Sequence, residues 1–394
     1  MSSQPIRVGL IGLNKSDCWA VNAHLPYLKD TSRYRIVALL NSSEDAARAA
    51  ISSHGLSSDT RAYGSPEKFA EDNDIELVVC SVRVDRHYPI LKPILEKTTA
   101  KAVHCEWPLG KNLAEAEELT KLAKSKGMKT ILGLQGRKAP TGILVKELIQ
   151  QGKIGKPLSI TITAIGYNFG AADFEALSYL SDISIGGNMV TIHFSHILDT
   201  VTQAVGELSS YSVVLDTMRD KTMLRNKPFT YVQKSESDEP VKIVGEVPRT
   251  SHDQIAIQGH LENGAVFSFH MRGGHPYPNT AGLDWRVYGE TGEIRVTAPS
   301  ANLHFGGPGH SVQVHNHETN SVEEVNIPQD SWDEKKLPFT ARAPARVYEA
   351  FADGKEHEYA TWDDAVQRHR LVEELYDRSK NGSTEKKAEY TSRL

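Results

Sequence analysis

Short apolar runs alternate with amphipathic stretches over the first third of the sequence. The apolar runs fall at residues 6–11, 34–40, 77–81, 102–105 and 130–134. The amphipathic stretches fall at residues 20–28, 44–52, 88–96 and 113–126. Strands this short and continuously apolar, each followed by a helix, are typical of a parallel sheet that helices cover on both faces. Because crossovers between parallel strands are right-handed, we expect residues 1–137 to form a doubly wound, Rossmann-type α/β domain.

The pattern changes after Pro140. Strands are predicted at residues 157–165, 255–261, 265–271, 285–288 and 293–296, with tight turns at 263–264 and 289–292. Helices are predicted at residues 142–151, 186–205 and 361–379, and the polar segments 226–249 and 301–338 are expected to be loop-rich. We therefore expect residues 138–380 to form an α+β domain with an open, mainly antiparallel sheet, followed by a polar tail at 381–394. The helix at 361–379 either stays with this domain or packs back on the first.

Charge and cysteine content exclude several classes of protein. The 394 residues carry a formal net charge of -5 that is spread along the sequence, so we expect no direct binding of nucleic acid. No apolar run approaches the roughly 18 residues that span a bilayer, so we expect no membrane partner. Cys18, Cys80 and Cys105 lack metal-ligand spacing and cannot all pair, which indicates reduced thiols. These features favour a cytoplasmic protein, or a nuclear one if its role is regulatory.

The turn after the first predicted strand is the candidate cofactor site. A pyrophosphate needs close approach of the backbone and free N–H groups at a helix N-terminus. Gly12 suits the tight turn, and Asn14, which tolerates a positive φ, stands in for the usual second glycine. After the second strand, Asn41 and Ser42 replace the acidic residue that binds the ribose of NAD, so NAD and NADP both remain open. This reasoning places the following residues at the dinucleotide: Gly12, Leu13, Asn14, Trp19, Asn41, Ser42, Ser81, Val82 and His87.

The sequence after the fourth predicted strand carries a family resemblance. Cys105-Glu106-Trp107-Pro108-Leu109 occupies the place of a Glu-Lys-Pro motif, and Arg137 and Pro140 follow the next strand. Residues 146–155 and the turn at 289–292 agree as well. On these motifs the chain resembles the glucose-fructose oxidoreductase and inositol dehydrogenase (Gfo/Idh/MocA) family over nearly its whole length. Residues 134–140 are most similar to the branch that contains the fungal regulators of galactose metabolism.

This resemblance implies a cofactor, partners and further site residues. It implies NAD or NADP in a Rossmann domain, a small-molecule substrate that is sugar-like, and a homodimer packed through the sheet of the second domain. A regulatory member of the branch would bind a transcription factor as its partner. The family motifs also imply cofactor contacts from Glu106, Trp107, Pro108, Gln135 and Arg137.

Two departures from the family pattern bear on catalysis. In family dehydrogenases the Lys of Glu-Lys-Pro handles the substrate hydroxyl and its proton, but the matching Trp107 cannot exchange a proton near neutral pH. The family also places an Asp four residues before a His; here His196 matches the His, and Ile192 stands in place of the Asp. His193 shares a helical face with His196, so the two imidazoles could form a proton relay or a polar patch. Asp199 could orient the His196 ring.

The catalytic and substrate candidates surround one expected pocket. His196 is the first choice for proton transfer, followed by His193 and Tyr179. Asp182 could bind a substrate hydroxyl or cap a helix, and Trp107 could stack on a sugar or fill the pocket. The substrate candidates are therefore Trp107, Asp182, His193 and His196.

Histidines gather in three stretches of the sequence, at residues 193–196, 270–275 and 304–317. Zinc sites usually show tighter helical spacing or cysteine partners, so we expect no metal at these stretches. The histidines after His304 lie in a polar, glycine-rich segment and are expected to face solvent.

Three functions are compatible with these observations. The first is an NAD(P)-dependent oxidoreductase that transfers a hydride to or from a sugar, polyol or other small hydroxyl or carbonyl compound. The second is a non-catalytic NAD(P)-binding transcriptional regulator, and the third is an NAD(P)-dependent lyase or glycosidase with no net redox change. We favour the first because the expected cleft keeps His196.

Overall fold

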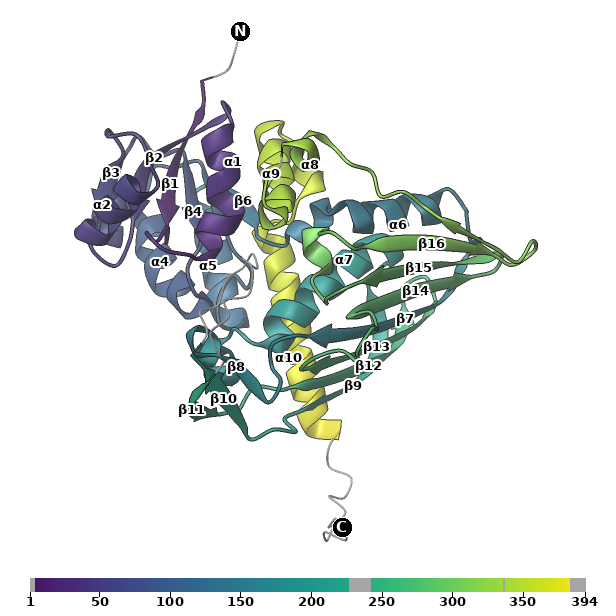
Figure 1. Cartoon of the computed structure of the whole chain (residues 1–394). Helices are drawn as coiled ribbons and strands as arrows, with labels where there is room; N and C mark the ends of the chain where they lie inside the picture. Colours follow the sequence, from purple (N-terminus) through teal and green to yellow (C-terminus); the bar gives the residue numbers. More distant parts are fainter. Residues whose placement is uncertain (1–3, 227–241, 336, 383–394) are drawn as a thin grey trace.

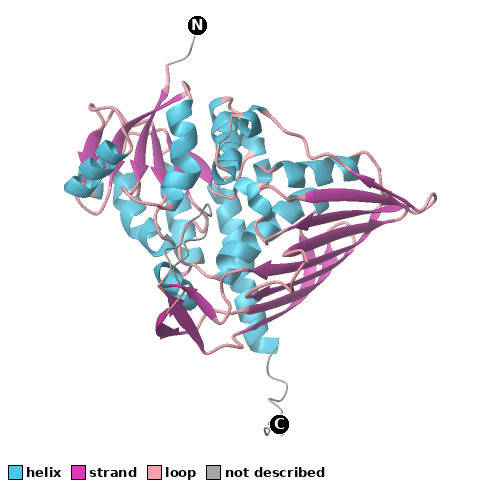
Figure 2. Ribbon diagram, in the orientation of Figure 1, coloured by secondary structure: helices cyan, strands magenta, loops and turns pink. Residues whose placement is uncertain are grey.

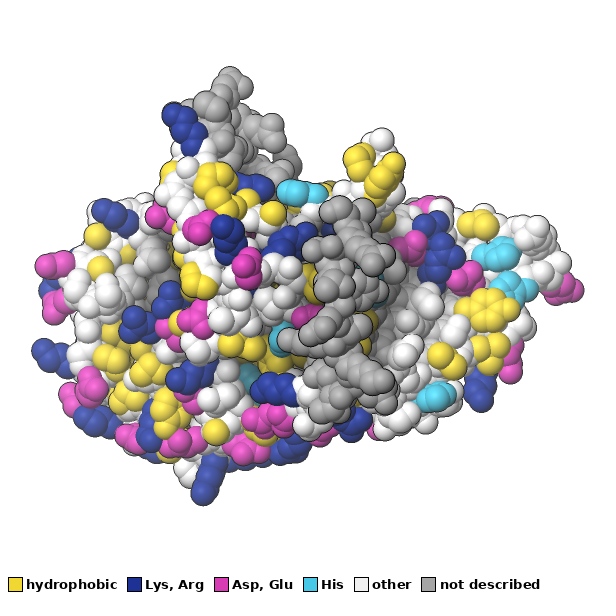
Figure 3. Space-filling view, turned by 90° about the horizontal axis from the view of Figure 1, so that it is seen from below, with side chains coloured by type: hydrophobic (Ala, Val, Ile, Leu, Met, Phe, Trp, Pro, Cys, Tyr) yellow, Lys and Arg dark blue, Asp and Glu magenta, His cyan; other side chains and the backbone are white. Residues whose placement is uncertain are grey.

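A computed structural model gives the structure of residues 4–226, 242–335 and 337–382 (Figure 1). Two sheets with helices between and around them form the two halves of the molecule (Figure 1). Of the helices in these residues, none is both long and apolar enough to cross a membrane. Among the described residues of the face shown in Figure 3, lysine and arginine are interspersed with aspartate and glutamate.

The N-terminal half is a six-stranded parallel sheet. Its strands are β1 (Ile6–Ile11), β2 (Tyr34–Leu40), β3 (Arg61–Tyr63), β4 (Leu77–Cys80), β5 (Ala102–Cys105) and β6 (Lys129–Leu132). They lie in the order β3-β2-β1-β4-β5-β6, with every neighbouring pair parallel. This order reverses between β1 and β4, and ligands of open α/β sheets bind in the crevice beyond the carboxyl ends of strands at such a point.

Helices cover both faces of this sheet, which explains why its strands are continuously apolar. All four residues of β4 are buried, for example. The helices are the π-helical turn η1 (Ala20–His24), α1 (Leu25–Asp30), α2 (Glu44–Ser53), α3 (Pro66–Ala70), α4 (His87–Lys97) and α5 (Leu113–Ser125).

The second half is built on an eight-stranded sheet in the order β17-β16-β15-β14-β7-β13-β12-β9. Only β7 and β13 pair in parallel among these strands, and the other pairs are antiparallel. The strands are β7 (Pro157–Gly166), β9 (Leu208–Asp216), β12 (Gln254–Leu261), β13 (Val266–Gly273), β14 (Leu283–Gly289), β15 (Gly292–Ala298), β16 (Ser311–Asn316) and β17 (Ser321–Glu324). The predicted fold class is therefore confirmed for both halves.

One face of the large sheet carries the core of this half. The helices α6 (Pro140–Gln150), α7 (Ser195–Val205) and α10 (Trp362–Gly382) lie on that face (Figure 2). Phe194, Leu198, Phe267 and Trp285 pack together there, because alternate side chains of each strand point inward. A smaller sheet, β11-β10-β8, lies beside it and consists of β8 (Ala172–Phe174), β10 (Lys221–Arg225) and β11 (Ile243–Pro248).

The helices near the C-terminus join the two halves. α8 (Ser331–Glu334) and α9 (Phe339–Ala352) lie against the parallel sheet's side of the molecule, and Tyr348 of α9 is buried in that domain's core. At the start of α10, Trp362 donates from its indole N–H to the carbonyl oxygen of Ile131 at 3.1 Å. Farther along α10, Leu375 lies in the core of the second half.

Several elements differ from the sequence-based expectations. The helix expected at 186–205 begins only at Met189, because Gly186 has φ +84° and Asn188 caps the following π-helical turn, η6 (Met189–Phe194). The segment 301–338 is not simply loop-rich, since it contains β16, β17 and α8, and the sequence analysis did not predict α9. Residues 227–241 and the tail from 383 lie outside the described residues. Short helical turns complete the chain: η2 (Val84–Arg86), η3 (Gln135–Lys138), η4 (Glu175–Ser181), η5 (Ile183–Ile185), η7 (Leu303–Phe305) and η8 (Glu356–Glu358).

Candidate functional site

The turn after β1 brings the backbone unusually close to the neighbouring strand. Gly12 has φ +92°, and a Cβ atom built there would lie 2.4 Å from the carbonyl oxygen of Ser81. Only glycine fits this position without strain or movement of backbone. Leu13 is buried, Asn14 is exposed, and the side-chain amide of Asn41 donates to the Leu13 carbonyl oxygen at 2.9 Å. The tight turn predicted from the sequence is therefore present.

Polar side chains lie at the carboxyl ends of the strands beside this turn. Ser81 follows β4 and Gln135 follows β6, and both side chains are buried. The Ser81 hydroxyl and the Gln135 amide oxygen have no hydrogen-bond partner among the described residues. Val82 is half-buried, and Ser42 is exposed at the end of β2. Buried polar groups without partners are rare, so these atoms indicate a site for a polar ligand.

These residues fit a dinucleotide. The Gly12 turn leaves no room for a side chain, which is the geometry that lets a backbone approach a pyrophosphate. The Ser81 hydroxyl and the Gln135 amide offer hydrogen bonds at the crevice of the sheet. The candidate cofactor residues that follow β1, β4 and β6 thus meet at one edge of the sheet.

Glu106 lies in a buried hydrogen-bond network. His24 contacts the Glu106 carboxylate at 2.7 Å through Nε2 and the Tyr348 hydroxyl at 2.8 Å through Nδ1. Burial would raise the pKa of the Glu106 carboxyl, but hydrogen bonds from His24 and Trp19, with the nearby imidazoles, hold it below its usual value. His104, between the rings of His24 and Tyr348, has its pKa lowered to about 3 by burial. Glu106 is therefore ionised at neutral pH.

Trp107 lies where the two halves of the molecule are in contact. Its indole N–H donates to the carbonyl oxygen of Thr191 in η6 at 2.5 Å, and its ring lies 4.7 Å from that of His369 in α10. The Trp107 side chain is buried, and Pro108 follows it. Because its only donor is already engaged, Trp107 is positioned to shape the pocket rather than to transfer a proton.

Three histidines lie close together on η6, α7 and η7: His196 and His304 are buried, and His193 is half-buried. The His196 and His304 rings stack with their centroids 4.2 Å apart, and His193 lies one turn before His196. Burial lowers the pKa of His193 and of His196 to about 4, so both rings are neutral at pH 7. Nδ1 of all three histidines lacks a partner among the described residues. His304 is buried because η7 folds this residue against α7, whereas His310, His315 and His317, which were expected to face solvent, are half-buried.

A row of aromatic rings links His304 to the segment that follows β1. The Phe305 ring lies 4.0 Å from that of His304 and stacks on Trp19 at 5.5 Å. Trp19, predicted at the cofactor, therefore belongs to the same site as His196.

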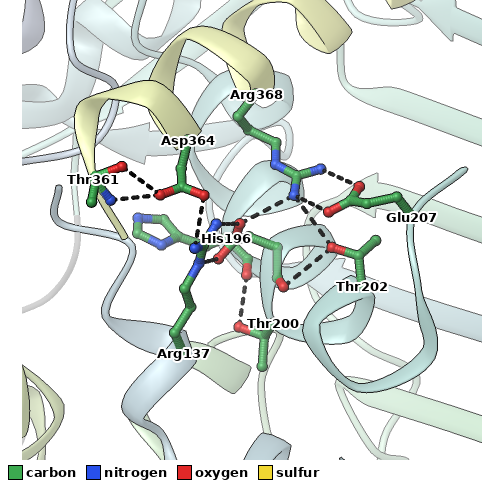
Figure 4. A network of polar contacts seen from close by, with 9 residues as sticks. Arg137, His196, Thr200, Thr202, Glu207, Thr361, Asp364 and Arg368 are labelled. Atoms are coloured by element: carbon green, nitrogen blue, oxygen red, sulfur yellow. Dashed lines mark hydrogen bonds and ion pairs between the residues drawn. The ribbon is translucent and has the colours of Figure 1, made fainter. Parts of the chain in front are cut away.

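Arg137 belongs to a network of ion pairs that includes Asp364 (Figure 4), and Asp199 is a second partner of its guanidinium group. The Arg137 guanidinium bonds to Asp199 at 2.9 Å and to Asp364 at 3.0 Å, and Arg368 bonds to Asp199 at 3.1 Å. Burial would raise the pKa of Asp199, but the two guanidinium groups outweigh it and hold that pKa below its usual value. The suggestion that Asp199 orients the His196 ring was therefore wrong, since both carboxylate oxygens face arginines.

The remaining predicted residues lie at the margin of this site. Asp182 accepts a hydrogen bond from the Ser184 backbone N–H at 2.9 Å, which is a capping role. Tyr179 is half-buried, with the Arg83 guanidinium 5.3 Å from its ring centroid. His87 begins α4, and its ring nitrogens face the carbonyl oxygens of Val82 and Pro108.

Comparison with known protein families adds to this geometry. Residues 6–134 match the model of the oxidoreductase family with an NAD-binding Rossmann fold, and residues 140–298 match the C-terminal domain of Gal80p. The galactose/lactose metabolism regulatory protein GAL80 of Saccharomyces cerevisiae is 33% identical over 304 residues, which cover 75% of this chain and 67% of that protein. The chain belongs to the Gfo/Idh/MocA family, in its Gal80-like branch. The resemblance predicted from the sequence is thus confirmed, and the first half is an NAD-binding Rossmann domain.

Relatives in this family include both regulators and a dehydrogenase. The dehydrogenase aclE of Aspergillus oryzae is 29% identical over 386 residues, covering 96% of this chain and 98% of that one. The corresponding GAL80 protein of Kluyveromyces lactis is 32% identical, and the match covers 64% of its length. The chain therefore spans about two thirds of the length of the two regulators.

Solved structures show the same family fold. A super-repressor mutant of Gal80p from Saccharomyces cerevisiae superposes with a TM-score of 0.84 at 26% identity, covering 96% of this chain and 97% of that chain. Levoglucosan dehydrogenase in complex with NADH and L-sorbose superposes with a TM-score of 0.73 at 18% identity, covering 96% and 98%. The second likeness extends to the fold alone.

The sequence analysis did not identify several residues of the site that lie far along the sequence from the predicted ones. They are His24, His104 and Tyr348 around Glu106, and His304 and Phe305 beside His196. A histidine within the apolar run 102–105 was the one available signal, because a polar residue in a fully buried strand needs a reason.

Proposed function

We propose that this protein is an NAD(P)-dependent oxidoreductase acting on a small hydroxyl or carbonyl compound of the sugar or polyol type. The observation that carries the proposal is the set of buried, unpartnered polar atoms on the two halves of the molecule. Ser81 and Gln135 offer them on the cofactor side, and His193 and His196 offer them on the opposite side. A polyol presents several hydroxyls, each of which could satisfy one of these atoms.

In this proposal His196 handles the substrate proton. The bound nicotinamide would supply or accept the hydride. Since His196 is neutral, its ring can accept the proton of a substrate hydroxyl during oxidation and return it during reduction. The ionised Glu106 lies close enough to favour the protonated imidazole electrostatically. His193, half-buried and one turn away, would hold a second hydroxyl.

A panel of aldoses and polyols, followed by nicotinamide absorbance, tests this activity. Steady turnover with any member of the panel is the expected result. His196→Asn should then lower kcat by roughly a hundredfold or more while leaving cofactor affinity unchanged. His260→Asn, on the exposed face of β12, is the matched control and should have no effect. Equal activity in both variants would show that another group carries the proton.

The cofactor preference belongs to the same proposal. No carboxylate stands at Asn41 or Ser42, so nothing repels the phosphate of NADP, and the ribose hydroxyls of NAD can still be bound by polar side chains. We expect the dissociation constants of NAD and NADP to agree within about tenfold by calorimetry. A difference of several hundredfold would contradict this expectation.

A second candidate is a cofactor-binding transcriptional regulator with a transcription factor as its partner. The observation that favours it is Trp107, which replaces a proton-carrying lysine and has its own N–H engaged by Thr191. The identity to the GAL80 proteins agrees with it. Cofactor binding without turnover on any compound of the panel would support this candidate over the first.

A further inference from the structure

Two cysteines and a histidine meet inside the Rossmann domain, where Cys80 directly precedes Ser81 and Cys105 directly precedes Glu106. Cys80 and Cys105 end the adjacent parallel strands β4 and β5 and are partners in register. His87, the first residue of α4, lies over the same strand ends. Both thiols are completely buried, and the imidazole is almost so. The two sulfur atoms and an imidazole nitrogen all lie within 4.8 Å of one another.

Both ring nitrogens of His87 face backbone carbonyl oxygens. Nε2 lies 3.0 Å from the Val82 carbonyl oxygen, and Nδ1 lies 2.9 Å from the Pro108 carbonyl oxygen. A neutral imidazole has one N–H group, so only one of these contacts can be a hydrogen bond, and the other brings a lone pair against an oxygen.

One of the two neutral tautomers of His87 leaves Nδ1 free to bind a metal ion. If Nε2–H donates to Val82, the Nδ1 lone pair is free, and Nδ1 lies 3.4 Å from Sγ of Cys105. A backbone carbonyl that fixes the far nitrogen of a ligating imidazole is the usual arrangement in metal sites. Ligands around one ion, with metal–sulfur bonds of about 2.3 Å and metal–nitrogen bonds of about 2.0 Å, lie roughly 3.5–4 Å apart.

We propose that Cys80, Cys105 and His87 bind a thiophilic d¹⁰ metal ion, Zn²⁺ or Cu⁺. Binding of Zn²⁺ would form two zinc–sulfur bonds and one zinc–nitrogen bond and release the two thiol protons to solvent. Two thiolates neutralise Zn²⁺, which suits complete burial, and the Pro108 carbonyl oxygen beside Nδ1 supplies a fourth ligand. Cu⁺ would keep the two sulfurs and the nitrogen in a three-coordinate site. This inference does not rest on the proposed catalytic function.

Metal titration of the full-length protein tests the site. The protein is reduced with a phosphine, stripped of metal and titrated with Zn²⁺ or Cu⁺ against a chromophoric chelator. We expect about one equivalent of at least one of the two ions to bind, with proton release in the Zn²⁺ arm. Cys80→Ser, Cys105→Ser and His87→Gln should each weaken binding roughly tenfold or more. Cys18→Ser is the matched control, because Cys18 is a half-buried cysteine outside the cluster, and it should bind like the wild type.

A second measurement avoids dependence on folded variants. In the wild-type protein, bound metal should slow alkylation of Cys80 and Cys105 during mild denaturation, while Cys18 reacts at the same rate with and without metal. Peptide mass spectrometry identifies which thiol is protected. The proposal is overturned if neither ion binds, if binding survives both cysteine variants, or if added metal leaves the labelling of Cys80 and Cys105 unchanged.

Discussion

At the scale of single residues, the clearest constraint is the close approach at Gly12. A side chain there would meet the Ser81 carbonyl oxygen, and the residue already has a positive φ. We expect Gly12→Ala to raise the dissociation constant of the dinucleotide by roughly tenfold or more, because the backbone must move away from the pyrophosphate. Isothermal calorimetry measures this loss.

Gly55→Ala separates close approach from backbone strain. Gly55 also has a positive φ, +57°, but no atom lies within 4 Å of the Cβ position. Gly55→Ala should lower the free energy of unfolding by about 1 kcal/mol, because alanine is strained at this positive φ, and it should leave cofactor affinity unchanged. Equal loss of affinity in the two variants would mean that Gly12 contributes through stability alone.

The buried state of His196 predicts the pH dependence of hydroxyl oxidation. The neutral ring is the proton acceptor, and burial places its pKa at about 4. kcat/KM should therefore stay level from about pH 8 down to about pH 5 and fall about tenfold per pH unit below pH 4. Initial rates would be measured over the range in which circular dichroism shows a folded protein. A fall that begins near pH 6.5 would indicate a solvated histidine instead.

At the scale of elements, Asp199 ties α7 to η3 and α10. Its carboxylate lies between Arg137 and the buried Arg368. Asp199→Asn would remove the carboxylate that Arg137 and Arg368 share and leave Arg137 with Asp364 and Arg368 with Glu207, so we expect a loss of about 3 kcal/mol in unfolding free energy. Asp363→Asn, which removes an exposed partner of Lys124, should cost no more than about 1 kcal/mol in the same urea titration.

The same network predicts acid sensitivity. The folded state holds the pKa of Asp199 below its ordinary value, so its ionisation stabilises the fold above about pH 4. That contribution should be lost as the pH falls through the folded pKa. Below about pH 4 the wild type and Asp199→Asn should therefore converge in stability.

The local pattern of apolar and polar residues predicted some of the strands and helices and missed others. The parallel strands were predictable because a strand buried on both faces is apolar throughout, as in β4. The helix α9 was missed because Pro344 lies inside it. The burial of His304 was not predicted, because a polar, glycine-rich stretch does not indicate that its ring stacks on His196. The meeting of Cys80 and Cys105 depends on strand order, which spacing along the chain does not reveal.

At the scale of the whole molecule, the outer face of the large sheet is the proposed homodimer interface. Helices pack on the other face, so Thr161 of β7 is exposed between Ser268 of β13 and Arg286 of β14. A two-fold dimer through this sheet would pack the same face of both copies together, so a carboxylate in that face would be buried without a partner. We expect Thr161→Glu to convert a dimer into a monomer by light scattering after gel filtration. Ser58→Glu, exposed in the Rossmann half, should leave the mass unchanged; an unchanged mass in both variants would place the interface elsewhere.

The path of α10 has a consequence for how the protein is made. Trp362 is completely buried among residues of the Rossmann core, although more than two hundred residues separate it from Ile131, its hydrogen-bond partner. A ribosome therefore translates the whole large sheet before Trp362 can fill its place in the Rossmann core, and Leu375, farther along α10, joins the core of the second half later still. Both halves thus receive core residues from one helix that is made after both sheets.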